Sequence, residues 1–309
     1  MVITHGALSP RRQRHALTVG NFDGVHRGHA AMLARVVTQA RALGVPGCVL
    51  TFEPHPREFF SPAAAPARLT RLREKLERFA QAGIERTHVA RFDAQLAGLA
   101  PERFIDDVLV AGLGAQWLLV GRDFRFGAKR AGDFALLERG AVRHGFALEA
   151  MPDVAEGGER VSSSAVRAAL GAGDLRRAEL LLGRRYTMSG RVVHGEGLGR
   201  PLGFPTANIV LRRRTPMTGI FVVEAELEET QRSLRGAASI GTRPTIREHA
   251  QPLLEVHLLD FEGVLYGKHL RVTFLEKLRA EQKFDGLEAL RAAIAADVAR
   301  ARNYFEAHG

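Results

Sequence analysis

The chain has 309 residues, 46% of them hydrophobic, which predicts about two domains with sizeable cores. It contains one cysteine, Cys48, so an intrachain disulfide is excluded and a reducing, cytoplasmic setting is expected. A membrane protein is not expected, because no apolar run reaches the ~20 residues of a spanning helix and the N-terminus lacks a signal-peptide pattern. The net charge of +10 is spread over both halves and suits nucleotides as substrates.

Strands and helices alternate over the first half of the chain. Short apolar runs predict the strands, and apolar residues at helical spacing predict the helices between them. Strands are predicted at residues 16–19, 47–53, 87–92, 116–121 and 146–151, with helices at 30–43, 69–82, 101–112 and 133–144. This alternation indicates an α/β fold with a parallel sheet, in which ligands bind at the carboxyl ends of the strands.

Residues 20–29, GNFDGVHRGH, lie between the first predicted strand and the first predicted helix. The N-terminus of a helix has unpaired N–H groups and a positive dipole, so it attracts phosphate. His26 and His29 are three residues apart and face one ligand if the helix begins near Gly28. Two imidazoles at such a point would stabilise charge in phosphoryl or nucleotidyl transfer. Half of a metal site and plain surface residues are the alternatives.

The same ten residues resemble the HxGH signature of the nucleotidyltransferase superfamily. Over their full length they resemble the adenylyltransferase half of bacterial FAD synthetases. The resemblance implies a Rossmann-like nucleotidyltransferase domain in which His26 and His29 are catalytic. It also implies that four more residues of the motif bind ATP: Gly20, Phe22, Asp23 and Gly28.

Two later loops follow predicted strands directly. TFEPHPREFF, residues 51–60, resembles the FAD synthetase segment with a nucleotide-contacting histidine, here His55, and a flavin-contacting aromatic residue, here Phe59 or Phe60. Its two prolines also have a simpler interpretation, which is that they end the strand. VGRDFRFG, residues 120–127, resembles the loop on the flavin and ATP side and contains Asp123. A local packing cluster is the alternative there.

The segment RVSSSAVR, residues 160–167, predicts a second phosphate site. Serines before AVRAAL predict a helix cap, and Arg167 lies about one turn into that helix. Hydroxyls, helix N–H groups and a guanidinium together bind phosphate. The segment resembles the SSTxxR-type motif that accompanies HxGH in adenylyltransferases, with Ser164 where threonine is frequent. The resemblance implies that Arg160, Ser163, Ser164 and Arg167 hold the phosphates of ATP.

The pattern changes to strands after Gly183. Strands are predicted at 189–194, 219–228, 237–240, 253–260 and 270–274, without a helical pattern between them, and a helix at 286–305. This spacing predicts an antiparallel sheet or β-barrel that ends in a helix. We therefore expect one domain at residues 1–182 and a second at 183–309.

A glycine-rich stretch, GRVVHGEGLGRPLGFPTAN, occupies residues 190–208 of the second domain. A flexible hairpin loop is its simplest interpretation, although such loops also cover phosphates. Thr206 and Asn208 are two residues apart, so their oxygens face one side in an extended chain. Uncharged oxygens and ATP phosphates hold Mg²⁺, which keeps several waters.

This stretch resembles the riboflavin kinase signature GxVxHGxxxGRxxGFPTAN almost completely. The resemblance implies that Thr206 and Asn208 bind Mg²⁺ and ATP, with Gly195, Gly203 and Pro205 near the phosphates. In LEVHLLDF it implies that Glu255 is the catalytic base; a polar residue on a half-exposed strand is the alternative. LEKLRAEQKFDGLEAL, residues 275–290, resembles the family segment near the flavin and implies a contact from Arg279.

The resemblance covers nearly the whole chain, with its motifs in order, and it identifies a member of the bacterial bifunctional riboflavin kinase/FMN adenylyltransferases. Three residues depart from the family pattern without removing a catalytic motif: Phe221, Ser239 and Arg185. The expected reactions convert riboflavin to FMN and FMN to FAD with two ATP, the flavins being substrates and products. Two alternatives are an adenylyltransferase for another phosphate ester and a nucleic-acid-binding protein with a β-barrel. The second is disfavoured, because the β region of this chain lacks paired aromatic residues for base stacking. No nucleic-acid or membrane partner is expected, and the oligomeric state stays open.

Overall fold

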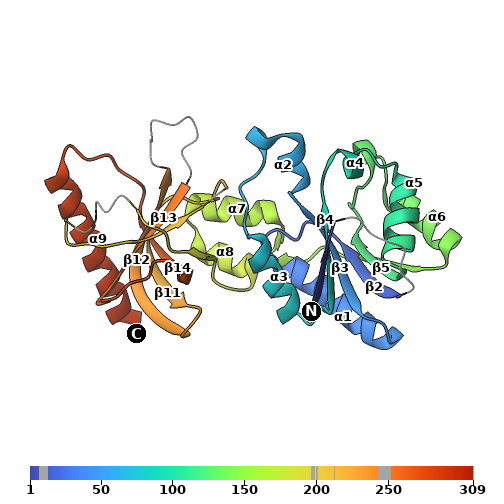
Figure 1. Cartoon of the computed structure of the whole chain (residues 1–309), viewed down its shortest axis with the longest axis horizontal. Helices are drawn as coiled ribbons and strands as arrows, with labels where there is room; N and C mark the ends of the chain where they lie inside the picture. The colour runs from blue at the N-terminus through green and yellow to red at the C-terminus, as the bar shows by residue number, and fades with distance from the viewer. Residues whose placement is uncertain (7–12, 196–198, 200, 212, 243–251, 309) are drawn as a thin grey trace. The chain divides into compact units, whose positions relative to one another are not determined.

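The computed structural model describes residues 1–6, 13–195, 199, 201–211, 213–242 and 252–308. They form two compact units (Figure 1). The first unit contains Met1–Pro66 and Thr70–Ser162, and the second contains Ala67–Leu69 and Ser163–Gly309. None of the described helices is long and apolar enough to cross a membrane.

The first unit is built on a six-stranded parallel sheet with the strand order β1-β4-β3-β2-β5-β6. Its strands are β1 (Val2–His5), β2 (His15–Val19), β3 (Gly47–Glu53), β4 (Arg86–Arg91), β5 (Ala115–Gly121) and β6 (Ala147–Met151). The chain runs outward from β2 through β3 to β4 on one side, and through β5 to β6 on the other. The carboxyl ends of β2 and β5 therefore form the switch point at which α/β sheets bind ligands. The expected α/β fold is confirmed.

Helices cover both faces of this sheet. Alternate residues of its central strands point to opposite faces, and each face has its own apolar cluster. Leu17 and Leu118 pack with Phe104 and Leu137 on one face, and Trp117 packs on the other with a cluster that includes helix residues. The helices are α1 (Arg27–Leu43), α2 (Pro56–Phe60), α3 (Leu72–Gln81), α4 (Ala94–Ala97), α5 (Pro101–Arg103), the π-helical η2 (Phe104–Gly112) and α6 (Phe134–His144). Short 3₁₀ turns lie at Pro62–Ala64 and Ala128–Arg130, and a hairpin pairs β7 (Ala155–Glu156) with β8 (Glu159–Arg160).

The second unit contains an antiparallel sheet with the strand order β10-β13-β12-β11-β14-β9. Its strands are β9 (Thr187–Arg191), β10 (Ala207–Val210), β11 (Gly219–Leu227), β12 (Arg232–Thr242), β13 (Pro252–Leu258) and β14 (His269–Arg279). Beyond β9, the N–H of Val193 donates to the carbonyl of Asn208 on β10 at 2.8 Å, so the two outermost strands meet. The sheet is thus a nearly closed barrel, as the sequence predicts.

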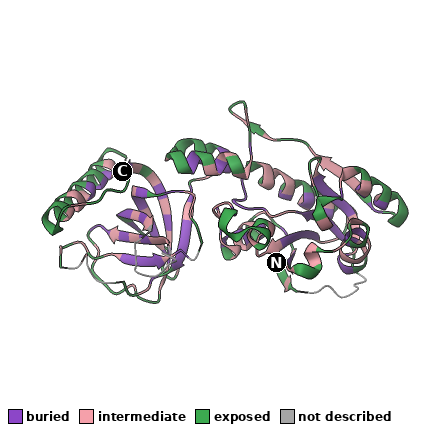
Figure 2. Cartoon of the chain, turned by 90° about the horizontal axis from the view of Figure 1, so that it is seen from above, coloured by how far each residue is buried: buried purple, intermediate pink, exposed green. Residues whose placement is uncertain are grey.

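The two faces of the barrel strands have different coverings. Phe221 and Phe274 meet on one face with their ring centroids 5.4 Å apart. Val222, on the other face, packs with Ala301 and Phe305 of the C-terminal helix α9 (Leu287–His308). Figure 2 shows buried residues along the strands, alternating with partly buried ones.

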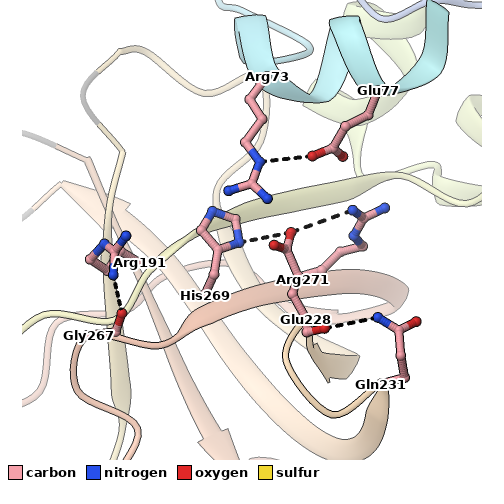
Figure 3. Close-up of polar contacts among 8 residues, drawn as sticks. All are labelled: Arg73, Glu77, Arg191, Glu228, Gln231, Gly267, His269 and Arg271. Atoms are coloured by element: carbon pink, nitrogen blue, oxygen red, sulfur yellow. Dashed lines mark hydrogen bonds and ion pairs between the residues drawn. The ribbon is translucent and has the colours of Figure 1, made fainter. Parts of the chain in front are cut away.

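At the end of the β11–β12 hairpin, a carboxylate oxygen of Glu228 lies 2.9 Å from His269 Nδ1 and 3.6 Å from Arg271 Nη2 (Figure 3).

Helices α7 (Ser163–Ala172) and α8 (Leu175–Leu182) belong to the second unit. The Tyr186 hydroxyl, just beyond α8, donates to the carbonyl of Leu69 at 3.1 Å, which joins that short segment to the same unit. The predicted boundary between residues 182 and 183 assigns both helices to the first domain, and it stays a prediction about where the chain divides.

Candidate active sites

The two histidines of GNFDGVHRGH lie together at the start of α1. His26 is the N-cap residue, and its Nδ1 accepts a hydrogen bond from the backbone N–H of His29 at 3.3 Å. Their rings stack with centroids 3.7 Å apart. Both imidazoles therefore stand beside the positive end of a helix dipole, at the carboxyl end of β2. An anion is the ligand that this arrangement favours.

The loop before α1 has a constrained backbone. Phe22, Gly24 and Val25 all have positive φ angles, of 50°, 86° and 40°. The Phe22 ring is 1% exposed and lies 5.0 Å from the His29 ring, so its side chain supports that imidazole from beneath. The Asp23 carboxylate is also buried, and its Oδ1 accepts hydrogen bonds from the N–H and hydroxyl of Thr70. Both side chains thus hold the loop in shape.

Two glycines of the motif permit close packing around these rings. A Cβ atom at Gly28 would lie 3.2 Å from the His26 imidazole, and one at Gly20 would lie 3.1 Å from the Phe22 ring. Contacts this short force the neighbouring ring to shift. The two glycines therefore fix where the His26 imidazole and the Phe22 ring lie.

Lys75 of α3 is a member of this site that the sequence does not mark. Its side chain is 2% exposed, and Nζ donates to the carbonyl of Asn21 at 2.9 Å and to the Thr51 hydroxyl at 3.1 Å. The lysine therefore holds the loop from below with a buried positive charge. In the sequence it is an ordinary lysine of an amphipathic helix, and nothing in its spacing distinguishes it.

The second loop places its histidine and its aromatic residues on α2. His55 caps this helix, since its Nδ1 accepts from the N–H of Arg57 at 3.1 Å. Phe59 and Phe60 are 38% and 63% exposed. Both rings lie edge-on to Phe92, at 5.6 and 5.7 Å, so three phenyl rings form one exposed cluster. Phe92 has no signal in the sequence that would predict this role, because it follows β4 as an isolated aromatic residue.

Asp123 and Arg160 form an ion pair at the end of β5. Arg160 Nη2 lies 2.9 Å from Asp123 Oδ2 and 3.0 Å from Asp153 Oδ1. The hydrogen bond to Asp123, with the charge of Asp153, raises the pKa of the Arg160 guanidinium above its ordinary value. Both side chains of the Asp123–Arg160 pair are more than half exposed, so a phosphate would compete with these carboxylates for the guanidinium.

The remaining predicted phosphate ligands lie on α7, in the second unit. Ser163 is the first residue of that helix, and Ser164 is exposed. The Arg167 Nε donates to the carbonyl of Ala67 at 2.7 Å. Ser163 and Ser164 thus lie in the first turn of the helix, and the guanidinium of Arg167 is held within the second unit.

In the barrel, strand register brings the predicted kinase residues together. Asn208 of β10 lies directly opposite Glu255 of β13, so the two side chains share one face. The Asn208 Nδ2 donates to the carbonyl of Thr206 at 3.1 Å and to its hydroxyl at 3.5 Å. The Asn208 Oδ1 is buried and has no hydrogen-bond partner among the described residues. A buried amide oxygen and a nearby hydroxyl are neutral oxygen donors, which can hold Mg²⁺ together with substrate phosphates and water.

The glycine-rich loop approaches this amide closely. A Cβ atom at Gly195 would lie 2.6–2.8 Å from three atoms of the Asn208 carboxamide, so the backbone packs directly against it. Pro205 presents its carbonyl to His257 Nδ1 at 2.9 Å, and Gly203 has a φ of 90°. Residues 196–198 and 200 of the predicted loop lie outside the described part of the chain.

Arg279 lies on the same face of the barrel as Glu255. Ser239 pairs with Glu255, Ile220 pairs with Ser239, and Arg279 pairs with Ile220. The guanidinium of Arg279 is bound by Asp297 of α9. The structure therefore places all three kinase motifs of the described chain on one barrel face.

Comparison with known proteins shows the family of the chain. The FAD synthetase family model matches residues 8–165, and the riboflavin kinase model matches residues 182–305. A bifunctional riboflavin kinase/FMN adenylyltransferase of Pseudomonas fluorescens is 50% identical over 296 residues, which are 96% of this chain and 94% of that protein. The chain belongs to this family. The riboflavin kinase/FMN adenylyltransferase of Escherichia coli K12 is 49% identical over 302 residues, 97% of this chain and 96% of the relative.

A solved structure supports the fold over the whole length. The crystal structure of a macrolide-efflux protein from Streptococcus pneumoniae matches with a TM-score of 0.81 and 27% identity, covering 98% of this chain and 99% of that chain. The two family models divide the activities between the halves of the chain. The N-terminal half is the FMN adenylyltransferase, and the C-terminal half is the riboflavin kinase.

Proposed function

We propose that phosphoryl transfer to riboflavin occurs beside Asn208 and Glu255, and that adenylyl transfer to FMN occurs at the start of α1. The register of β10 and β13 is the observation that supports the first assignment, because it sets a carboxylate opposite a buried, unsatisfied amide oxygen. The stacked histidines at a helix N-terminus support the second.

In the kinase reaction, Glu255 takes the proton of the ribityl 5′-hydroxyl as that oxygen attacks the γ-phosphorus of ATP. The bond from the γ-phosphorus to the bridging oxygen breaks, and FMN and ADP are formed. Thr206 and Asn208 would hold a magnesium ion through neutral oxygens, the Thr206 hydroxyl and the buried Oδ1 of the adjacent Asn208 amide. When bound, Mg²⁺ neutralises charge on the ATP phosphates. Gly195, Gly203 and Pro205 bring the loop backbone towards those phosphates.

In the adenylyltransferase reaction, a phosphate oxygen of FMN attacks the α-phosphorus of a second ATP, and pyrophosphate leaves. The attack needs no protein nucleophile. His26, His29 and the N–H groups of α1 stabilise the charge on the transferring group. The proposed ATP ligands in the first unit are Gly20, Phe22, Asp23, Gly28, His55, Asp123 and Arg160, and the proposed flavin ligands are Phe59, Phe60 and, in the kinase, Arg279. The ATP contacts of Ser163, Ser164 and Arg167, which lie in the second unit, stay a prediction from the motif.

The chain's own composition supports a cytoplasmic setting for these reactions, since its single cysteine, Cys48, is buried and allows no intrachain disulfide. HxGH alone does not select the acceptor, so at the level of that motif a different phosphate ester is the alternative to FMN. FMN is favoured over it, because the kinase half of the same chain produces FMN.

A magnesium titration of FMN formation tests the assignment of the kinase site. Gly195→Ala inserts a methyl group against the Asn208 carboxamide and should raise the Mg²⁺ needed for half-maximal activity by about tenfold, as displaced ligand supports do. Gly171→Ala is the matched control, since its new Cβ lies at an ordinary 3.5 Å from Pro216 O. FMN is separated from riboflavin after incubation with ATP, with and without a chelator. An unchanged Mg²⁺ requirement in Gly195→Ala would remove Asn208 from the proposed metal site.

A further inference from the structure

The guanidinium of Arg279 is held in a defined plane by α9. Its Nε donates to both carboxylate oxygens of Asp297, at 3.0 and 3.1 Å, and its Nη2 donates to Oδ2 at 2.7 Å. Asp297 is 5% exposed. A forked pair of this kind fixes orientation as well as adding binding energy.

The other edge and face of the guanidinium are also engaged. Nη1 donates to the carbonyl of Ala280 at 3.1 Å, and the Phe284 ring lies 5.6 Å from Cζ. Within the described residues, one N–H on each terminal nitrogen has no acceptor. Arg279 therefore presents two oriented donors.

Strand register relates these donors to the proposed catalytic base. Glu255, Ser239, Ile220 and Arg279 are successive direct pairs across four strands, so they share one face. Three strand spacings separate Glu255 from Arg279, about 14 Å along the sheet. A riboflavin whose 5′-hydroxyl reaches Glu255 would bring its ring system to Arg279 if it lies along this row.

We infer that Asp297 is a positioning residue for riboflavin binding. It acts through Arg279, by holding the guanidinium so that its remaining donors face the flavin, and the inference rests on the proposed flavin contact of Arg279. Helix α9 is then part of the kinase site as well as a cover for the barrel.

A purely structural role for Asp297 would be to anchor α9, and a second ion pair provides the control for it. Arg302 of the same helix donates to both oxygens of Asp260, just beyond β13, at 2.8 and 2.7 Å. This pair also joins α9 to the barrel with forked geometry, but it makes no contact with Arg279. If anchoring is all that Asp297 does, loss of neither pair should raise the riboflavin KM in a protein that stays folded.

The experiment uses the full-length protein with Asp297→Asn, Arg279→Met, their combination, and Arg302→Gln. Steady-state kinase kinetics give KM for riboflavin, KM for ATP and kcat, and quenching of riboflavin fluorescence gives its Kd. Asp297→Asn should raise the riboflavin KM and Kd by about tenfold, as the loss of charge-assisted hydrogen bonds does. Its kcat and ATP KM should stay within about twofold of wild type. The double variant should be no worse than Arg279→Met, because the two residues act as one unit.

Thermal unfolding and FAD formation from supplied FMN check folding in every variant. A riboflavin KM in Asp297→Asn equal to that of Arg302→Gln overturns the inference. If Arg279→Met itself leaves the riboflavin KM unchanged, the proposed flavin contact fails as well, which is a distinct result. If Asp297→Asn does not fold, Asp297→Glu replaces it in the experiment. This variant keeps the negative charge but shifts the carboxylate by one methylene. It should raise the riboflavin KM with unchanged unfolding temperature, and a wild-type KM there overturns the inference too.

Discussion

His26 and His29 reach their site from a single turn of chain, whereas Asn208 and Glu255 reach theirs from two strands that pair in register. In the first unit one strand, one loop and one helix start supply the proposed catalytic groups. In the second unit the groups come from β10, β13 and β14, with α9 behind them. The first site therefore depends on local backbone geometry, and the second depends on the alignment of distant segments.

The two sites also differ in the charge that they favour. Imidazoles, helix N–H groups and the buried Lys75 favour an anion at the start of α1. A carboxylate and neutral oxygens favour a proton donor and a hard cation at the barrel face. Because each unit has its own product, FMN or FAD, one protein sample reports on both sites. Damage to one site should leave the other product as an internal control.

The largest effect is expected from Glu255→Gln. Glutamine keeps the size and hydrogen-bonding capacity of the residue but does not accept the proton of the 5′-hydroxyl. Riboflavin kinase kcat should therefore fall by about 10²–10⁴-fold, the usual contribution of a general base. The ATP KM should change little. FMN formation followed over a range of ATP concentrations measures both.

FAD formation from supplied FMN is the control for this variant, because it uses the other unit. It should proceed at the wild-type rate, with an unchanged circular dichroism spectrum. Wild-type kinase turnover in a folded Glu255→Gln protein would leave Glu255 as a polar residue on the barrel surface.

The next largest effect is expected from His29→Ala. Its imidazole stacks on His26 at the start of α1, so its removal takes one charge-stabilising group from the adenylyl transfer. FAD formation should fall by about 10²-fold or more, as the loss of a transition-state donor does. FMN formation from riboflavin should stay near normal. Equal loss of both products would instead indicate that His29 supports the fold.

The same difference explains how much of each site the sequence predicts. GNFDGVHRGH is contiguous, so its residues and its helix start are legible in one string, and the structure places both histidines where that string indicates. Thr206 and Asn208 are close for the same reason. The pairing of Asn208 with Glu255 needs the register of β10 and β13, which no single segment encodes. Only the family resemblance connected those residues in advance.

Residues that act by supporting others are the ones that the sequence does not mark. Lys75 binds the loop carbonyl of Asn21 from a helix some fifty residues later, and Phe92 completes the aromatic cluster of α2 from the end of β4. In the sequence each resembles an ordinary helix or loop residue. The contact that gives it a role is with a distant segment, so no local pattern indicates it. The edge strand β1 is missed for a related reason: it has four residues and is defined by its pairing with β4.

The smallest effect on catalysis is expected from the choice of where the kinase half is cut from the chain. Two fragments, which begin at residue 163 or at residue 183, test whether α7 and α8 belong to the kinase domain. Helices α7 and α8 belong to the second unit and bury seven apolar side chains: Val166, Ala169, Leu170, Leu175, Ala178, Leu181 and Leu182. A fragment of residues 163–309 should therefore phosphorylate riboflavin without forming FAD. A fragment of residues 183–309 loses these helices and should unfold at a temperature lower by about 10 °C, since each kcal/mol shifts the midpoint by about 4 °C in a domain of this size.

Thermal unfolding of both fragments, with kinase turnover measured well below either midpoint, makes this comparison. Turnover should be similar in the two fragments, because every proposed kinase residue lies beyond residue 183, whereas stability should differ. Equal midpoints would assign α7 and α8 to the first domain and support division between residues 182 and 183. A folded 163–309 fragment without kinase activity would contradict the separation of the two activities altogether, because it retains the whole barrel and α9.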